Sequence, residues 1–469
     1  MTTTEYDLIV IGAGAVGENI ADRAVQGGLT ALVVESELVG GECSYWACMP
    51  SKALLRSGIA LRAAKAVGGT REAVTGGLDV AATFARRDGF THDWDDASQV
   101  EWLDGAGIDL VRGHGRITGE RRVSVRETVY TARHAVAVAT GSAALLPDVP
   151  GLAGARPWTS RDATSARSAP KSLAILGGGV VAAEMATAYA SFGTEVTVIA
   201  RSGLLGGQEP FAGELVAESL ERLGATLRLD VSPRRVSRDA TGVTLELDDG
   251  SSVTAEELLV ATGRIPRTMD LGLDAIGLEP GRWLEVDDTM RVRGTDWLYG
   301  VGDVNHRALL THQGKYQARA AGDAIAARAQ GRAVDEAPWG AHVATADHAA
   351  VPQVTFTDPE VASVGRTAAD AAAAGLRTRV LDVDLGALAG AGAHRDGYEG
   401  RARAVVDEDR GVLVGVTFAG PGVGEMLQAA TIAVTAEVPL SRLWHAVPAF
   451  PTLSEVWLRF LEAYGRPTP

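Results

Sequence analysis

The chain has 469 residues and a formal net charge of −15 at pH 7, from 59 acidic and 44 basic side chains. This excess of acid, without a block of lysine and arginine, argues against nucleic acid as a partner. The length predicts about three domain-sized units, and the 46% apolar composition is ordinary for a globular protein. The sequence shows neither a signal-peptide pattern nor an apolar run of membrane length, so we expect a cytoplasmic protein without a membrane partner.

The first predicted elements form a strand–helix–strand unit of the kind that binds dinucleotides. An apolar strand at 7–11 leads through a glycine-rich turn into a helix, and a second strand follows at 30–34. The turn carries three glycines in the dinucleotide-binding spacing: Gly12, Gly14 and Gly17. The first makes the turn, the second lets the backbone approach a pyrophosphate at the helix N-terminus, and the third lets helix and strand pack closely. Glu35 ends the second strand, where an acid accepts hydrogen bonds from a ribose diol.

The two cysteines of the chain, Cys43 and Cys48, stand close together in the stretch 40–52. A disulfide across so short a loop removes little entropy from the unfolded chain, so the spacing favours a reversible disulfide over a structural one. In a reducing cytosol such a pair is more often catalytic or redox-sensing. Pro50 and the helix-forming residues 51–66 predict a helix start, whose dipole favours a thiolate. The alternative is a pair of inert, buried thiols.

The chain then continues through a mixed region to a linker. Three further strands are expected before it, at 110–117, 123–130 and 136–139. The last strand leads into Thr140 and Gly141, and the proline- and glycine-rich residues 147–151 predict the linker.

A second strand–helix–strand unit begins near Lys171, with strands at 173–176 and 196–199 and a helix that ends near Phe192. Its turn repeats the dinucleotide spacing with alanine in third place: Gly177, Gly179 and Ala182. After the second strand stands Arg201 instead of an acid, which favours the 2′-phosphate of NADPH over NADH. The alternative is that Arg201 is a solvated loop charge. Two nucleotide folds imply two nucleotides, with a tightly held carrier such as a flavin to pass electrons between them.

The remaining elements complete an α/β chain that ends in an α+β unit. A strand at 258–261 leads to Gly263, and a strand at 297–301 leads to Gly302 and Asp303. From about residue 346 the glycine fingerprint is absent. Strands are expected there at 351–356, 401–406 and 411–418, and helices at 368–374, 425–436 and 453–463.

Together these motifs resemble the flavin-dependent pyridine nucleotide–disulfide oxidoreductases, which include dihydrolipoamide dehydrogenase, glutathione reductase and mercuric reductase. The resemblance covers essentially the whole chain. It implies two Rossmann-like dinucleotide-binding domains, for FAD and NAD(P), and a C-terminal α+β dimerisation domain, hence a homodimer. The implied segments are an FAD-binding domain at 1–150, an NAD(P)-binding domain at 151–265, a second FAD-binding part at 266–345, and the dimerisation domain at 346–469. No metal site is implied.

The resemblance also implies roles for the motif residues. The positions that match cofactor contacts and domain crossings are Gly12, Gly14, Gly17, Glu35, Gly41, Thr140, Gly141, Gly177, Gly179, Ala182, Arg201, Gly263, Gly302 and Asp303. NADPH, with NADH as the alternative, would deliver a hydride to one face of FAD, and the disulfide would be reduced at the other face. Cys48 would lie nearer the flavin and hold the thiolate, and Cys43 would attack a substrate disulfide. Lys52, paired with Glu184, would supply positive charge where the reduced flavin becomes anionic.

One position departs from the family pattern. Most members carry a histidine before a proline near the C-terminus, and the partner subunit uses it as the acid–base for the outer thiol. Here Phe450 takes the histidine position, while Glu455, the residue that orients the histidine, is kept. General acid–base help is typically worth about 10²–10⁴-fold. The change therefore puts the usual route of disulfide reduction in question.

Three explanations of the missing histidine stay open. His445 could replace it, although its neighbours predict a structural or partly buried side chain, and Glu455 could itself act as base. A substrate such as a quinone, a metal ion or an electrophile needs no protonated leaving thiol. Phe450, Tyr45 and Trp46 could stack a flat ring at such a site, or simply pack around the flavin. Mercuric reductases also depart from the histidine pattern but usually carry a terminal cysteine pair, and this chain ends in 467–469 without one.

The sequence therefore supports three functions. The first is a dimeric NADPH-dependent FAD disulfide reductase with an atypical proton relay. The second is a reductase of quinones or of other electrophilic or metal acceptors, and the third is a flavoprotein redox sensor with slow turnover. The intact cysteine pair, together with Lys52 and Glu184, argues against the third.

Overall fold

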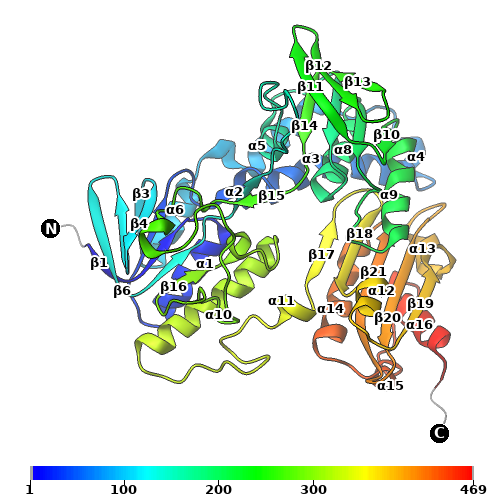
Figure 1. Cartoon of the computed structure of the whole chain (residues 1–469). Helices are drawn as coiled ribbons and strands as arrows, with labels where there is room; N and C mark the ends of the chain where they lie inside the picture. The colour runs from blue at the N-terminus through cyan, green and yellow to red at the C-terminus, as the bar shows by residue number, and fades with distance from the viewer. Residues whose placement is uncertain (1–3, 467–469) are drawn as a thin grey trace. The chain divides into compact units, whose positions relative to one another are not determined.

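The computed structural model describes residues 4–466 and shows two compact units (Figure 1). Unit 1 contains the described residues up to Pro50, with Asp88–Ala144 and Arg264–Asp347. Unit 2 contains Ser51–Arg87, Leu145–Gly263 and the described residues from His348 onward. The chain end at 467–469, which was compared with the terminal cysteine pair of mercuric reductases, lies outside the described residues. The four-segment domain division remains a prediction.

Unit 1 is built on a seven-stranded sheet in the order β3-β2-β1-β6-β5-β4, with β16 also paired to β6. Its strands are β1 Glu5–Ile11, β2 Ala31–Glu35, β3 Ile108–Arg112, β4 Gly115–Gly119, β5 Arg122–Val125, β6 Thr128–Val138 and β16 Leu298–Gly300. The neighbours β3, β2, β1, β6 and β16 pair in parallel, whereas β4, β5 and β6 pair antiparallel. The second half of β1, Leu8–Ile11, is apolar and buried because a parallel strand is covered on both faces.

Three strand predictions in this unit were wrong in their bounds. The expected strand at 110–117 is two strands, β3 and β4, and the one at 123–130 is β5 and the start of β6. The expected short strand at 136–139 is the end of the eleven-residue β6. Alternation of apolar and polar residues continues through both tight turns, so the pattern alone does not show where each strand stops. Arg126 has a φ of 54° at the second turn. A positive φ is uncommon for residues other than glycine, so the arginine does not predict this turn.

The helices of unit 1 pack closely because small residues line their contact. They are α1 Ala15–Gln26, α2 Gly41–Tyr45, α6 Ala97–Gly105 and α10 Thr311–Ala329. A Cβ atom on Gly314 of α10 would lie 2.5 Å from the Val16 side chain, and one on Gly322 would lie 2.6 Å from Arg23 Cβ. α10 therefore lies directly against α1, the helix that follows the first glycine turn. The short strands β7 Ser142–Ala144 and β15 Arg264–Pro266 pair antiparallel.

Unit 2 contains the second dinucleotide-type sheet, parallel and four-stranded in the order β10-β9-β8-β14. Its strands are β8 Ser172–Leu176, β9 Glu195–Ala200, β10 Thr226–Leu229 and β14 Glu257–Val260, with helices α7 Ser160–Ser165, α8 Val180–Ser191 and α9 Pro210–Arg222. A three-stranded antiparallel sheet, β11 Pro233–Asp239, β12 Gly242–Leu247 and β13 Ser252–Ala255, was not anticipated. Its strands are short, β11 is rich in charge, and few of the side chains are buried.

The C-terminal part of unit 2 is an α+β layer on a five-stranded antiparallel sheet, β17-β18-β21-β20-β19. The strands are β17 Pro352–Thr355, β18 Glu360–Gly365, β19 Thr378–Asp384, β20 Arg401–Asp407 and β21 Val412–Gly420. The helices of this part are α12 Ala368–Ala373, α13 Ala389–His394, α14 Leu427–Thr435, α15 Leu440–Leu443 and α16 Val456–Tyr464. The three predicted strands and three predicted helices are present, whereas β18 and β19 were not anticipated.

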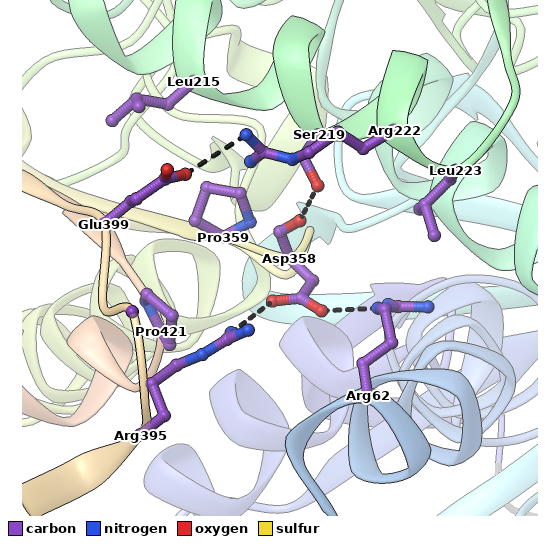
Figure 2. Close-up of a pocket in the computed structure, with 11 residues that line it drawn as sticks. Arg62, Leu215, Ser219, Arg222, Leu223, Asp358, Pro359, Arg395, Glu399 and Pro421 are labelled. Carbon is purple, nitrogen blue, oxygen red and sulfur yellow. Dashed lines mark hydrogen bonds and ion pairs between the residues drawn. The ribbon is translucent and has the colours of Figure 1, made fainter. Parts of the chain in front are cut away.

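Helices α3 Cys48–Lys65, α4 Thr70–Ala73, α5 Val80–Phe90 and α11 Ala346–Ala349 complete the regular structure. Within unit 2, α3 is tied to the C-terminal sheet through Asp358, in the β17–β18 connection (Figure 2). The Asp358 carboxylate accepts from Arg62 of α3 and lies 3.9 Å from Arg395, and its carbonyl accepts from Ser219 of α9. One carboxylate thus pairs with cations from two segments, which fixes the helix that carries Lys52. Among residues 4–466, no helix is long and apolar enough to cross a bilayer.

Candidate active site

The first glycine turn has the geometry of a dinucleotide site. Gly12 has a φ of 105°, and a Cβ atom there would lie 2.6 Å from the Ala139 carbonyl oxygen, so only glycine fits the turn. A Cβ atom on Gly17 would lie 1.8 Å from the Gly12 carbonyl oxygen, which explains the third glycine. A Cβ atom on Gly14, in contrast, would meet only Gly41 Cα, at 3.9 Å, and Gly14 is the N-cap residue of α1 without a side-chain cap. The backbone N–H groups at this helix start are therefore left for an external anion.

Glu35 lies at the end of β2, beside this turn. Its carboxylate accepts hydrogen bonds from the backbone N–H of Ala13, at 2.6 Å, and of Glu37, at 2.7 Å. The side chain is buried, and burial raises its pKa while the two backbone donors lower it. The carboxylate is thus fixed in orientation at the turn, with lone pairs left to accept from hydroxyl groups.

Asp303 and the turn that carries it lie in the same unit. The Asp303 carboxylate accepts a hydrogen bond from the Ser142 hydroxyl, and Arg264 Nε lies 3.8 Å from its Oδ2. Burial raises the pKa of Asp303, while Ser142 and Arg264 act to lower it. Thr140, next to Gly141, donates its hydroxyl hydrogen bond to the Arg267 carbonyl at 2.9 Å. The two chain crossings at 140–142 and 264–267 are therefore joined beside Asp303.

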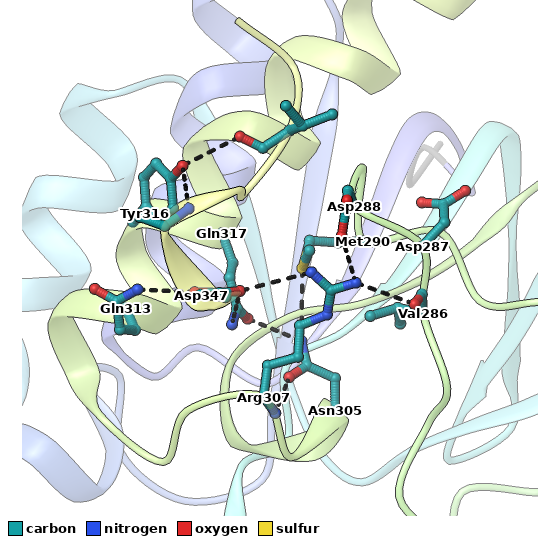
Figure 3. Close-up of polar contacts among 12 residues, drawn as sticks. Val286, Asp287, Asp288, Met290, Asn305, Arg307, Gln313, Tyr316, Gln317 and Asp347 are labelled. Carbon is teal, nitrogen blue, oxygen red and sulfur yellow. Dashed lines mark hydrogen bonds and ion pairs between the residues drawn. The ribbon is translucent and has the colours of Figure 1, made fainter. Parts of the chain in front are cut away.

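A buried polar network holds the turn Gly302–Asn305 in place (Figure 3). The Gly302 N–H and the Asn305 amide both donate to Gln317 Oε1, at 2.9 and 2.8 Å. The Gln317 amide in turn donates to Asp347 at 2.9 Å, and Gln313 donates to the other oxygen of Asp347 at 2.8 Å. The Asp347 side chain has no solvent exposure. The network therefore orients the turn that presents Asp303.

These groups in unit 1 fit FAD. The fit rests on an uncapped helix start at Gly14, a fixed carboxylate at Glu35, and a second, half-buried carboxylate at Asp303. An anionic pyrophosphate suits the helix start, and hydroxyl groups of ribose and ribityl chains suit the two carboxylates. Gly41 completes the turn region, because a Cβ atom there would lie 2.7 Å from Gly14 Cα.

The two cysteines lie side by side in the reduced form, and both are half-buried. α3 begins at Cys48, three residues before the predicted start, so Cys48 lies at the positive end of the helix dipole. Cys48 Sγ lies 3.3 Å from the Thr311 hydroxyl of α10. The pKa of Cys43 is raised, first by its hydrogen bond to Cys48 and then by burial. Both effects favour the protonated form of the Cys43 thiol.

Lys52 and Glu184 form an ion pair within unit 2, across 132 residues of sequence. Lys52 Nζ lies 2.8 Å from Glu184 Oε2 and 3.1 Å from Oε1. The Glu184 carboxylate is buried in α8 and also accepts from the Phe356 N–H at 3.0 Å. The Lys52 ammonium lies 4.7 Å from the centre of the Phe356 ring, at cation–π distance. Lys52 is thus held by two elements, with part of its side chain still exposed.

The second glycine turn repeats the geometry of the first. Gly177 has a φ of 134°, and a Cβ atom there would lie 2.2 Å from the Ala261 carbonyl oxygen. Gly179 begins α8 without a side-chain cap and has open space around it, and Ala182 is fully buried. Arg201 follows β9 directly and is exposed. Gly263 follows β14 with a φ of 143°, at the chain crossing that the sequence indicated.

The segment around the missing histidine is exposed, and the structure corrects one expectation there. His445 is exposed, so the prediction of a structural or partly buried side chain was wrong. Phe450 is 75% exposed and Val447 is 84% exposed. Glu455 is buried, with one carboxylate oxygen 2.7 Å from Arg459 and the other without a partner. Its oxygens are not aimed at solvent, which weakens the alternative that Glu455 itself is the base.

The aromatic residue Tyr45, close to both cysteines in sequence, is buried. Tyr45 is 2% exposed and contacts Trp46 edge to face, with ring centres 5.8 Å apart. Its backbone carbonyl accepts from the Trp94 indole at 3.1 Å. Tyr45 is therefore a packing residue of unit 1 and is not placed to stack a substrate ring.

Comparison with known sequences identifies the family. A sequence model described as pyridine nucleotide-disulphide oxidoreductase matches residues 6–331, and one described as the dimerisation domain of these proteins matches residues 351–459. The chain belongs to the pyridine nucleotide-disulphide oxidoreductase family. The predicted family and the α/β fold are confirmed, and members are FAD-dependent with NADH or NADPH as electron donor.

Individual relatives of this oxidoreductase span nearly its full length. A dihydrolipoyl dehydrogenase from Haloferax volcanii is 32% identical, covering 98% of this chain and 96% of the relative. A mercuric reductase from Staphylococcus aureus is 29% identical, covering 96% of this chain and 81% of the reductase. The Cu(II) complex of the HOCl-induced flavoprotein disulfide reductase RclA from Escherichia coli has a TM-score of 0.83 at 21% identity, covering 98% and 99% of the two chains. At that identity the likeness shows a shared fold.

Sequence reasoning missed several residues of this oxidoreductase site. Thr311 comes from α10, a helix for which no prediction was made, and Phe356 was taken only as the end of a strand. Ser142 directly follows the Thr140-Gly141 motif, so its place in the site could have been inferred from that motif.

Proposed function

We propose that this chain is a homodimeric, NADPH-dependent reductase that passes electrons through FAD and the Cys43–Cys48 pair to a disulfide substrate. The observation that carries the proposal is the adjacency of the only two thiols, one of them at the start of α3. When bound, FAD supplies the two-electron chemistry that links a nicotinamide to sulfur. Cys43 is the thiol that attacks the substrate, and Cys48 is the thiol that closes the disulfide again.

The remaining residues have supporting roles in this proposal. The Lys52 ammonium, held by Glu184 and Phe356, stabilises negative charge that develops on the cofactor. Val447 and Phe450 support the homodimer, because two highly exposed apolar side chains in a segment that matches a dimerisation domain favour burial against a second copy. Turnover by such a pair requires proton exchange at sulfur, for which Phe450 offers no group.

An anaerobic titration tests this function. NADPH added to the FAD-loaded protein should bleach the flavin and produce a long-wavelength charge-transfer absorbance, because a Cys48 thiolate would lie against the flavin. A Cys48→Ser variant is the control, since it should bleach without the long-wavelength band. Bleaching of the wild type without that band would remove the Cys48 thiolate from the proposal, and no bleaching at all would leave the slow redox sensor.

A second function is favoured by Phe450. Phe450 is an exposed apolar side chain that cannot transfer a proton, at the position where the family pattern has an acid–base residue. Such a side chain suits an acceptor that needs no protonated leaving thiol, such as a quinone, another electrophile or a metal ion. The mercuric reductases among the relatives add metal ions to this class. An anaerobic screen of disulfides, quinones and metal ions against the NADPH-reduced protein separates the two functions by which class reoxidises it.

Arg201 should determine the preference for NADPH. Its guanidinium is exposed directly after β9, where a 2′-phosphate would be placed, and an arginine–phosphate contact is charge-assisted. Arg201→Ala should raise the KM for NADPH about tenfold and leave that for NADH within about twofold. Steady-state kinetics with both nucleotides measure the difference, and Arg201→Lys, which keeps the charge, should lie between. Equal changes for the two nucleotides would contradict the assignment.

A further inference from the structure

Unit 2 contains a cavity of about 210 Å³ that the electron path described so far does not use (Figure 2). It lies where α3, α9 and the C-terminal sheet meet, and the residues that line it are Arg62, Leu215, Ser219, Arg222, Leu223, Asp358, Pro359, Arg395, Gly397, Glu399 and Pro421. Neither cysteine, neither glycine turn and neither member of the Lys52–Glu184 pair is among these lining residues. The cavity is therefore a separate feature of the molecule.

The charged side chains at this cavity are three arginines and two acids. Asp358 lies between the guanidinium groups of Arg62 and Arg395, and Arg62 Nε donates to it at 2.5 Å (Figure 2). Arg395 Nη1 is 3.9 Å from the other Asp358 oxygen, which is beyond hydrogen-bond distance. Glu399 lies 3.1 Å from Arg222 Nη1. At neutral pH the lining thus has one positive charge more than it has negative charges.

Two guanidinium nitrogens of this cluster, Arg62 Nη2 and Arg395 Nε, are buried and have no hydrogen-bond partner among residues 4–466. The two side chains are only 24% and 27% exposed. A buried donor on a charged group is costly to leave without an acceptor, and native structures satisfy such groups with protein, water or an ion. Because both arginines line the cavity, an occupant of the cavity is the group that would complete their hydrogen bonding.

We propose that this cavity binds one small oxyanion, of the size and chemistry of inorganic phosphate or a short dicarboxylate. A guanidinium has N–H donors and no acceptor, so the two nitrogens require an oxygen acceptor, and a charged one binds more strongly than a neutral one. The excess of positive charge favours an anion over water. The volume of about 210 Å³ is below the roughly 300–1,000 Å³ of pockets for drug-sized ligands, which argues against a nucleotide here.

The exposed side of the cavity gives an anion its way in. Arg222 and Glu399 are exposed, and their ion pair joins α9 to the segment before β20. Exposed ion pairs of this kind contribute little stability, so an incoming anion can replace Glu399 beside Arg222. Glu399 therefore competes with the anion, whereas Arg395 binds it.

Calorimetric titration with inorganic phosphate tests the site in the full-length, FAD-loaded protein at constant ionic strength. An Arg201→Ala background removes the contact proposed for the nucleotide 2′-phosphate, so the result does not depend on the proposed function. We expect saturable binding with a Kd of about 0.1–1 mM, as suits a charged ligand of few heavy atoms.

Three substitutions in that background locate the bound phosphate. Arg395→Gln should raise the Kd at least about tenfold, because it removes a cation with an unpartnered donor. Glu399→Gln should lower the Kd about three- to tenfold, because a neutral amide no longer competes for Arg222. Arg56→Gln is the matched control, since it removes the same charge from an exposed position on α3 that does not line the cavity, and it should leave the Kd unchanged.

Opposite shifts in the two cavity variants support the site, and Glu399→Gln decides alone if Arg395→Gln does not fold. If phosphate gives no saturable heat, or if both cavity variants bind it as Arg56→Gln does, water fills the cavity and the proposal is overturned. Succinate titrated in the same way distinguishes the sources of the oxyanion. With the same pattern among the variants, tighter binding of succinate assigns the site to an organic acid, and weaker binding assigns it to inorganic phosphate.

Discussion

A Cys43→Ser variant should reduce disulfides at least about 10³-fold more slowly than the wild type, because it lacks the nucleophile of the proposed exchange. A serine hydroxyl stays protonated near neutral pH and forms no bond to sulfur that a second thiol could break. The variant should still take up FAD, since the glycine turn, Glu35 and Asp303 are untouched. Anaerobic stopped-flow kinetics with NADPH and a panel of small disulfides measure both properties.

The control for this variant is Ser44→Ala, which changes the adjacent residue of α2 without touching either thiol. It should retain disulfide reduction within about twofold, in the range of ordinary surface or half-buried substitutions. If Cys43→Ser loses disulfide reduction but still reduces quinones at the wild-type rate, the result supports the second proposed function, the reduction of quinones or other acceptors. Disulfide reduction that survives in Cys43→Ser would show that electrons leave the protein by a path without the dithiol.

The parts of the fold and site that the sequence predicts are those with local signals. The two glycine turns have backbone conformations and close approaches that only glycine allows, as at Gly12 and Gly177, so the motif and the geometry coincide. Cys43 and Cys48 are close in space because they are close in sequence. Lys52 and Glu184 are a different case: 132 residues separate them, and only the resemblance to a family paired them in advance.

The parts that escaped prediction depend on tertiary contacts or on weak turns. Thr311 is placed beside Cys48 by the packing of α10 on α1, which depends on Gly314 and Gly322. The local sequence does not predict the contact between Thr311 and Cys48. The sheet β11–β13 has short strands that bury few side chains, and β11 is rich in charge, so its apolar signal is weak. The exposure of His445 could not be inferred from its aromatic and apolar neighbours, because these pack elsewhere or face solvent too.

A Phe450→His variant should raise kcat/KM for disulfides by about 10²-fold or more, because it places a proton donor at the position where the family pattern predicts a histidine. We propose that Glu455 would orient the imidazole, since its Oε2 is buried and has no partner while Arg459 donates to the other oxygen. The gain should depend on pH through a group near the ordinary histidine pKa of about 6.5. Steady-state kinetics from pH 5.5 to 9 measure the gain and its profile.

Phe450→Leu is the matched control, because it changes the shape of the apolar side chain without adding a proton-transfer group. It should leave disulfide reduction near the wild-type rate, and Phe450→His combined with Glu455→Gln should lose most of the gain. If histidine and leucine at position 450 behave alike, proton transfer from this position does not limit disulfide turnover. Unchanged disulfide rates together with slower quinone reduction in both variants would show that Phe450 serves an apolar acceptor, since a phenyl ring offers a flat substrate more apolar ring area than imidazole or leucine does.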